Sequence, residues 1–125
     1  MTIKTVLLAE DDEISRMIIA QILSYRQDIR LFVVTDGKAA LEVAMDRRFD
    51  LMIFDCNMPY IPGDRVIRQL KAGRTINAKT PVIQITADIE LVKAGVGGTG
   101  LANVVVSKPI SSKEFLAIII RLLGI

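Results

Sequence analysis

Short apolar runs alternate with amphipathic stretches along the 125 residues of the chain. Runs of four or five β-branched and aliphatic residues are typical of strands that are buried in a sheet. Five such runs lie at residues 5–9, 31–34, 51–54, 81–85 and 103–107. We therefore predict one strand at each of them.

The stretches between these runs carry apolar residues at three- and four-residue spacing, which predicts amphipathic helices. The first covers about 13–25, the second follows Asp36 as an N-cap, and the third follows Gly63. A last helix begins at an S-x-x-E sequence, Ser111 to Glu114, which predicts a capping box.

Strands that alternate with helices form right-handed βαβ units, and such units build a parallel sheet with helices on both faces. The pattern therefore predicts an α/β fold with three layers and a doubly wound sheet. Because no linker or low-complexity segment interrupts the alternation, we expect residues 1–125 to form a single domain.

Composition narrows the class of protein. The chain is 51% hydrophobic and 24% charged, and its net charge of +2 is too small to predict binding to nucleic acid or to an anionic membrane. The single cysteine excludes an internal disulfide, and the apolar stretch at 115–125 is too short to span a bilayer. We expect a cytoplasmic protein without membrane or nucleic-acid contacts. Since the chain has no histidine, imidazole chemistry would have to come from a partner.

Acidic residues follow two of the predicted strands. The first strand runs into Glu10 and Asp11, and the third ends at Asp55. In a doubly wound sheet, ligand sites form outside the carboxyl ends of the strands. If the first and third strands are neighbours, the three carboxylates meet, and two such charges about 4 Å apart repel by roughly 4 kcal/mol. A hard cation bound by oxygens would relieve that repulsion, and this donor set suits Mg²⁺.

Two further strand ends carry groups that complement these acids. Thr86 supplies a hydroxyl at the end of the fourth strand, and Lys108 supplies an ammonium at the end of the fifth. A metal and an ammonium neutralise charge on phosphoryl oxygens, and a hydroxyl donates to one of them. The set predicts a phosphoryl-handling site in which Asp55 is the nucleophile and forms an aspartyl phosphate.

The motifs "VLLAEDDE", "DCNMPYIPG", "TAD" and "SKPIS" occur in this order over nearly the whole chain. In order and spacing they resemble the receiver domain of two-component signalling, the response-regulator family. The chain is similar both to the receivers of hybrid histidine kinases and to single-domain response regulators. The resemblance implies a flavodoxin-like fold whose five parallel strands lie in the order 2-1-3-4-5.

The resemblance also implies a role for each candidate residue. Asp55 matches the phosphoacceptor, Thr86 the switch hydroxyl and Lys108 the lysine of the site. The Mg²⁺ ligands would be Asp11 and Asp55, Glu10 through water, and the backbone carbonyl of Asn57. The family further implies a cis peptide bond between Lys108 and Pro109, an isomer that only X-Pro bonds adopt at low cost.

For partners, the resemblance implies a phosphoryl donor and a downstream protein target. The donor would be a histidine kinase or a histidine phosphotransfer protein. It would dock over exposed residues of the first helix, with Ile14, Met17 and Ile18 as candidates, and over the loop after Pro109. Asn57 and Asp88 could hold an attacking water, so we expect relatively quick self-dephosphorylation. The chain would then catalyse only reactions of its own aspartate.

Two alternatives remain open at this point. A degenerate receiver would keep the fold but act only as a protein-binding module, independently of phosphorylation. A haloacid-dehalogenase-type phosphatase would also use an aspartate nucleophile with a Thr or Ser and a Lys. That class needs a second aspartate two positions after the first, where this chain has Asn57.

Several features depart from the expected pattern or need a plainer interpretation. The sequence "GVGGTG" at 95–100 matches a dinucleotide motif, but it precedes a strand instead of following one, so we reject that interpretation. The glycines instead predict a short or frayed helix over 93–101. Val105 stands where many receivers have an aromatic residue, so we hypothesise that phosphorylation orders the glycine-rich segment.

Cys56 is interpreted as a structural thiol. The basic side chains that follow Gly63 are interpreted as a solvated helix surface; they are Arg65, Arg68, Lys71 and Arg74.

Overall fold

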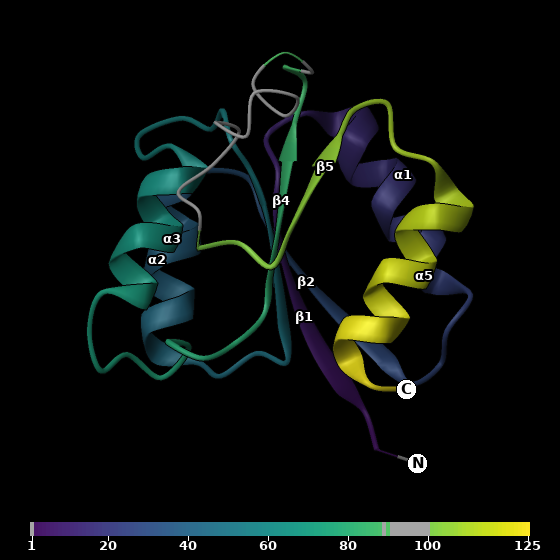
Figure 1. Ribbon diagram of the computed structural model, residues 1–125, viewed down its shortest axis with the longest axis horizontal. Helices are drawn as coiled ribbons and strands as arrows, with labels where there is room; N and C mark the ends of the chain where they lie inside the picture. Colours follow the sequence, from purple (N-terminus) through teal and green to yellow (C-terminus); the bar gives the residue numbers. More distant parts are fainter. Residues whose placement is uncertain (1, 89, 91–100) are drawn as a thin grey trace.

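The computed structural model describes residues 2–88, 90 and 101–125 (Figure 1). Strands and helices alternate along the chain. The strands are β1 (Lys4–Ala9), β2 (Ile29–Val34), β3 (Leu51–Asp55), β4 (Val82–Thr86) and β5 (Val104–Ser107). The helices are α1 (Glu13–Ser24), α2 (Gly37–Asp46), α3 (Gly63–Lys71) and α5 (Ser112–Leu123).

All five strands form one parallel sheet in the order β2-β1-β3-β4-β5. This is the predicted order, and it makes β1 and β3 neighbours, with Val6 opposite Leu51. Each predicted strand is confirmed, and the largest difference is in β2, which begins at Ile29 instead of residue 31. The switch in strand order therefore lies between β1 and β3, at the ends that carry the acidic residues.

Helices cover both faces of the sheet, as the burial of alternate side chains requires. In β1, Val6 and Leu8 pack against α1 and α5, whereas Leu7 and Ala9 pack against α2 and α3. Figure 1 shows the same division, with α1 and α5 on one side of the sheet and α2 and α3 on the other. The central strands β1, β3 and β4 are thus largely buried on both faces, which explains why they read as continuous apolar runs, whereas the edge strands β2 and β5 are only partly buried.

The helix starts differ in how their N-caps work. Asp12 and Asp36 accept hydrogen bonds from the backbone N–H groups of Ser15 and Ala39, as N-caps do. Ser111 is the N-cap of α5, but within the described residues its side chain makes no capping hydrogen bond. The predicted capping box is therefore wrong at the level of side chains. Ser111 and Glu114 are both exposed, so water can satisfy these groups.

The predictions on the glycine-rich segment, including the frayed helix over 93–101, fall outside the described residues except at Leu101. Among the described helices, none combines the length and the apolar character that crossing a bilayer would require.

Candidate functional site

The loop after β1 places one buried and one exposed acid at the edge of the sheet. Glu10 is fully buried, while Asp11 is exposed. The loop backbone is held by Arg16 of α1, whose Nη1 donates to the carbonyl of Glu10 at 3.2 Å and to that of Asp11 at 2.7 Å. Asp12 then caps α1, which fixes the point where the loop that carries Glu10 and Asp11 joins the helix.

Asp55 is the last residue of β3, and its side chain is almost completely buried. The strand continues its pairing for one more residue, because the N–H of Cys56 donates to the carbonyl of Ile85 at 2.9 Å. Gly63, the first residue of α3, packs directly against this strand end. A Cβ at Gly63 would lie 1.9 Å from the carbonyl oxygen of Asp55. Only glycine therefore lets α3 approach so closely.

The carboxylates of Glu10, Asp11 and Asp55 converge as predicted. Each of them offers one oxygen, and the three oxygens lie within 4.8 Å of one another. Three negative charges at such separations repel strongly unless a cation lies among them. The adjacency of β1 and β3 produces this cluster, because the register aligns the ends of the two strands.

Lys108 brings a positive charge to the same cluster from the end of β5. Its Nζ lies 3.3 Å from Oε1 of Glu10, 3.1 Å from Oε2 of the same residue and 3.6 Å from Oδ1 of Asp55. Its backbone N–H donates to the carbonyl of Thr86 at 2.8 Å, and the predicted cis peptide bond to Pro109 is confirmed. A single ammonium thus contacts two acids at the ends of different strands.

Burial dominates the titration of this cluster. It raises the pKa of Glu10 to about 7, with the Asp55 charge acting in the same direction against hydrogen bonds from Asp12 and Lys108. Burial likewise raises the pKa of Asp55, although the Lys108 ammonium opposes that shift. For Lys108 burial acts to lower the pKa, but the hydrogen bond to Glu10 and the two acidic charges raise it above its usual value. Without a further cation, the acids resist full ionisation.

The donor set fits a small divalent cation. All three acids offer hard oxygen ligands, which suit Mg²⁺ better than a soft transition metal. Oε2 of Glu10 is buried and has no hydrogen-bond partner among the described residues; its 3.1 Å approach to Lys108 is an ion pair with poor hydrogen-bond geometry. A buried carboxylate oxygen of this kind gains from a cation.

Thr86 and Asn57 lie at the same edge of the sheet. Thr86 ends β4, is almost completely buried, and its hydroxyl accepts from the N–H of Asp88 at 3.1 Å. The backbone N–H of Asn57 hydrogen-bonds the Asp55 carboxylate, and the Asn57 side chain is exposed. Asp88 is exposed as well, so both polar residues expected to hold a water are open to solvent.

The structure also shows contributors that the sequence did not reveal. Arg16 orders the acidic loop through backbone carbonyls, which no side-chain pattern signals. Gly63 could have been suspected, because a glycine directly after a proline opens a helix there. Cys56 is half-buried, burial raises its pKa, and its thiol contacts the Thr86 hydroxyl, so its interpretation as an unreactive structural thiol is supported.

Comparisons with known proteins agree with this geometry. The family model of the response regulator receiver domain matches residues 6–120. The chain is 33% identical over 115 residues to the response regulator ArlR of Staphylococcus epidermidis, covering 90% of the chain and 49% of that protein. It is 32% identical over 126 residues to hybrid signal transduction histidine kinase D of Dictyostelium discoideum, covering 94% of the chain and 7% of that protein. The chain thus spans half or less of the length of these relatives.

Solved structures extend the likeness to the whole fold. The receiver domain of the sensor histidine kinase PA1611 from Pseudomonas aeruginosa, which has a magnesium ion coordinated in its active-site cleft, superposes with a TM-score of 0.85 at 25% identity. That match covers 99% of this chain and 100% of the other. The chemotaxis response regulator CheY4 of Vibrio cholerae shares the fold with a TM-score of 0.83 at 24% identity, covering 97% of this chain and 99% of the other. The chain therefore belongs to the response regulator receiver domain family of two-component signalling.

Proposed function

We propose that the chain accepts a phosphoryl group on Asp55 from the phosphohistidine of a histidine kinase or of a phosphotransfer protein. One observation carries this proposal: a nearly buried strand-end carboxylate lies 3.6 Å from the Lys108 ammonium and within a cluster of three acids. The acids can hold a cation, and the ammonium stays charged. The site therefore combines a nucleophile with the positive charge that a phosphoryl group needs.

In the transfer, a carboxylate oxygen of Asp55 forms a bond to phosphorus while the donor's phosphorus–nitrogen bond breaks, and its electron pair stays on the imidazole. Lys108 is already oriented by Glu10 and Asp55, so it can pair with a phosphoryl oxygen without being reorganised. The Thr86 hydroxyl, at the end of the neighbouring strand, can donate to another oxygen. Its engagement would alter the Asp88 contact and thereby the following loop.

Glu10, Asp11, Asp55 and the Asn57 carbonyl would hold Mg²⁺ in this site. When bound, the ion neutralises charge on the acids and on the phosphoryl oxygens. The carboxylate cluster supports this assignment. The magnesium ion in the cleft of the PA1611 receiver domain is consistent with it.

An apolar surface on α1 supports docking of the donor beside the site. Ile14 is 69% exposed and Met17 is 64% exposed, as expected for a surface that meets a partner. A cavity of about 380 Å³ extends this surface toward Lys108 and Pro109, and a second one of about 460 Å³ lies between α1 and α5. We propose that the phosphoryl donor docks here, and that a downstream protein reads the phosphorylated state.

Phosphorylation can be tested by intact-mass measurement after incubation with Mg²⁺ and acetyl phosphate or phosphoramidate. We expect the mass of one phosphoryl group to be added, and Asp55→Asn to abolish the addition. Asp46→Asn, which removes an exposed acid at the end of α2, is the matched control and should not change it. Release of phosphate after removal of the donor would measure the predicted quick self-dephosphorylation.

Absence of any adduct in the folded protein would refute phosphoacceptance and support the degenerate receiver. Catalytic hydrolysis of phosphomonoesters would instead support a phosphatase. Transfer from a purified phosphohistidine donor, with and without Met17→Glu, tests the docking surface. The substitution should slow transfer from the protein donor and leave the reaction with acetyl phosphate unchanged.

A further inference from the structure

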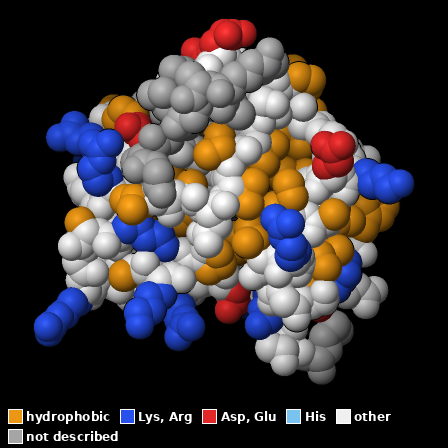
Figure 2. Space-filling model, viewed as in Figure 1, with side chains coloured by type: hydrophobic (Ala, Val, Ile, Leu, Met, Phe, Trp, Pro, Cys, Tyr) orange, Lys and Arg blue, Asp and Glu red, His pale blue; other side chains and the backbone are white. Residues whose placement is uncertain are grey.

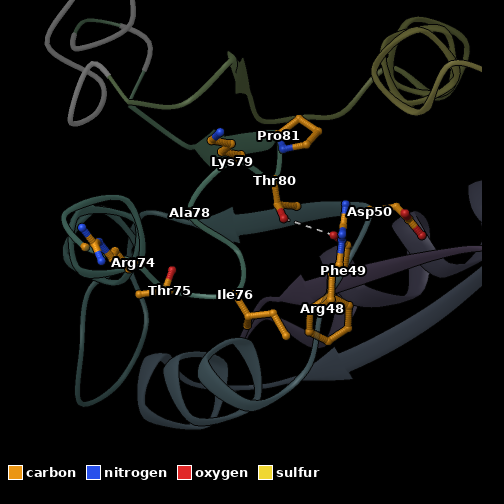
Figure 3. Close-up of a pocket in the computed structure, with 11 residues that line it drawn as sticks. Arg48, Phe49, Asp50, Arg74, Thr75, Ile76, Ala78, Lys79, Thr80 and Pro81 are labelled. Carbon is orange, nitrogen blue, oxygen red and sulfur yellow. Dashed lines mark hydrogen bonds between the residues drawn. The ribbon is translucent and has the colours of Figure 1, made fainter.

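A further hollow, separate from the two cavities beside α1, lies at the end of the sheet opposite the acidic cluster. It is a cavity of about 480 Å³ formed by residues 48–50, which precede β3, and by the loop between α3 and β4 (Figure 3). Strands β3 and β4 begin here and end at Asp55 and Thr86. The two ends of the same two strands therefore carry separate sites, so a ligand of this cavity would not compete for Asp55.

Behind the cavity wall, a buried asparagine joins two of the lining residues, Phe49 and Thr80. Asn77 is fully buried; its Oδ1 accepts from the N–H of Phe49 at 2.9 Å, and its Nδ2 donates to the carbonyls of Ala44 at 2.6 Å and Arg47 at 2.7 Å. The Thr80 hydroxyl lies 2.9 Å from the same Oδ1 and 3.1 Å from the Phe49 carbonyl. These bonds join the α3–β4 loop to the end of α2 and to the segment that precedes β3, so the walls of the cavity are held in place.

The charge of the cavity wall is positive. Arg48, Arg74 and Lys79 contribute three cations, against one acid, Asp50. One oxygen of the Asp50 carboxylate accepts from the N–H of Thr5 at 2.8 Å and from its hydroxyl at 3.3 Å; the carboxylate keeps its charge, so the three cations and one acid leave the lining a net charge of +2. The three cations are exposed and remain available to a ligand.

The segment that contains most of α3 and the α3–β4 loop is also basic. Residues 65–87 contain five Lys or Arg residues and no acid. Figure 2 shows Lys and Arg side chains projecting on the side of the molecule where α2 and α3 lie. Lys71 is an exception, because its ammonium donates to the carbonyl of Thr80 and is not available to a ligand. An anion approaching this end of the molecule is therefore attracted by these cations.

We propose that this cavity binds a small phosphorylated molecule, with Arg48, Arg74 and Lys79 as the phosphate ligands. The volume lies within the range of small-molecule sites. The planar guanidinium groups of two arginines suit phosphate oxygens, and a lysine adds a third charge. In Figure 3, Arg74 and Thr75 lie on one side of Ile76, and the segment of Arg48 lies on the other. Ile76 is 51% exposed and offers an apolar surface to the rest of the ligand.

The shape of the site favours a small ligand over a polyanion. The cavity cations come from two segments that face one another, whereas a nucleic acid would spread over the exposed arginines of α3, Arg65 and Arg68. These two groups of cations can be removed separately.

The test is an NMR titration of the Mg²⁺-free, ¹⁵N-labelled chain with pyrophosphate and with ATP, with adenosine as the uncharged control. We expect saturable shifts confined to residues 48–50 and 73–81, and none with adenosine. Removing two phosphate ligands in the double variant Arg74→Ala, Lys79→Ala should weaken binding at least about tenfold. The matched control, Arg65→Ala with Arg68→Ala, removes the same charge from α3 and should change affinity by less than about twofold, through the long-range field alone.

Thermal unfolding of both double variants establishes that they fold. The proposal is overturned if no saturable shift occurs at millimolar ligand, or if the two double variants lose affinity equally. It is also overturned if a single-stranded oligonucleotide binds more tightly than ATP and depends on Arg65 and Arg68. Because the titration involves neither Mg²⁺ nor Asp55, failure here leaves the proposed phosphoacceptance unaffected.

Discussion

The charged side chains at the two ends of the parallel sheet differ in sign and in burial. At the carboxyl end, Glu10 and Asp55 are buried together and share one ammonium, so burial shifts their pKa values. At the amino end, Arg48, Arg74 and Lys79 are exposed around a cavity whose walls are joined by neutral hydrogen bonds. At the carboxyl end the unbalanced charges are therefore buried in the protein, while at the amino end water solvates them.

This difference predicts where a ligand changes stability. A cation at the carboxyl end relieves repulsion that the fold itself creates, so binding and folding are strongly linked. Water already solvates the cations at the amino end, so a ligand there gains affinity only from its own contacts. Equivalent substitutions at the two ends should consequently have unequal effects on the free energy of unfolding.

The largest expected effect concerns pH and Glu10. A carboxyl whose pKa is about 7 in the folded protein and near 4.5 when unfolded holds its proton more tightly in the folded state. Stability of the Mg²⁺-free protein should then fall as pH rises from about 4.5 to about 7, by up to about 3 kcal/mol. Urea unfolding across this pH range measures the slope.

Glu10→Gln should flatten this slope, and Mg²⁺ should stabilise the unsubstituted protein more at pH 7 than at pH 5. Glu42→Gln, an exposed acid on α2, is the control and should leave the slope intact. An unchanged slope in Glu10→Gln would show that the buried acids do not create the imbalance.

At the amino end, the largest effect should follow the loss of Asn77. Asn77→Ala removes the partners of the Phe49 N–H and of two carbonyls, and should cost about 2 to 3 kcal/mol of unfolding free energy. Gln69→Ala, at an exposed position of α3, should change stability by less than about 0.5 kcal/mol. Equal losses for the two variants, measured by urea unfolding, would show that Asn77 does not hold these segments together.

A glycine-to-alanine substitution should change stability by different amounts at the two ends of the sheet. Gly63→Ala places a Cβ 1.9 Å from the Asp55 carbonyl, so α3 must shift, at a cost of about 2 kcal/mol. Gly73→Ala, at the rim of the cavity, meets no atom within 4 Å and should be neutral to within about 0.5 kcal/mol. Midpoints of thermal unfolding would show the difference. Phosphorylation by acetyl phosphate should slow only in Gly63→Ala, because only that substitution displaces Asp55.

The smallest contrast compares one lysine at each end. Lys108→Ala in the Mg²⁺-free protein leaves Glu10 and Asp55 without their ammonium and should cost about 1 kcal/mol near pH 7, since part of the loss is offset by protonation. Lys79→Ala removes a solvated charge and should change stability by less than about 0.5 kcal/mol. If urea unfolding gave equal values, the ammonium at the carboxyl end would be no more than a surface charge.

Much of the fold could be predicted from the sequence because its signals are local. Strands buried on both faces are continuous apolar runs, and Asp12 and Asp36 are caps that act within one turn of the helix. The capping box failed for the same kind of reason, since an exposed Ser111 is satisfied by water and needs no reciprocal bond. The acids at the strand ends were visible as residues, and the family motifs implied which of them belong together.

The sequence by itself thus determined the order of the elements, the strand ends that carry acids, and the sign of the charge along α3. Only the tertiary structure decided that Glu10 and Asp55 share Lys108, that Gly63 must lack a side chain, and that Asn77 joins the walls of a cavity. These contacts join segments far apart in the chain. Their energies come from burial and from distances of a few ångströms, which are properties of packing and not of the order of residues.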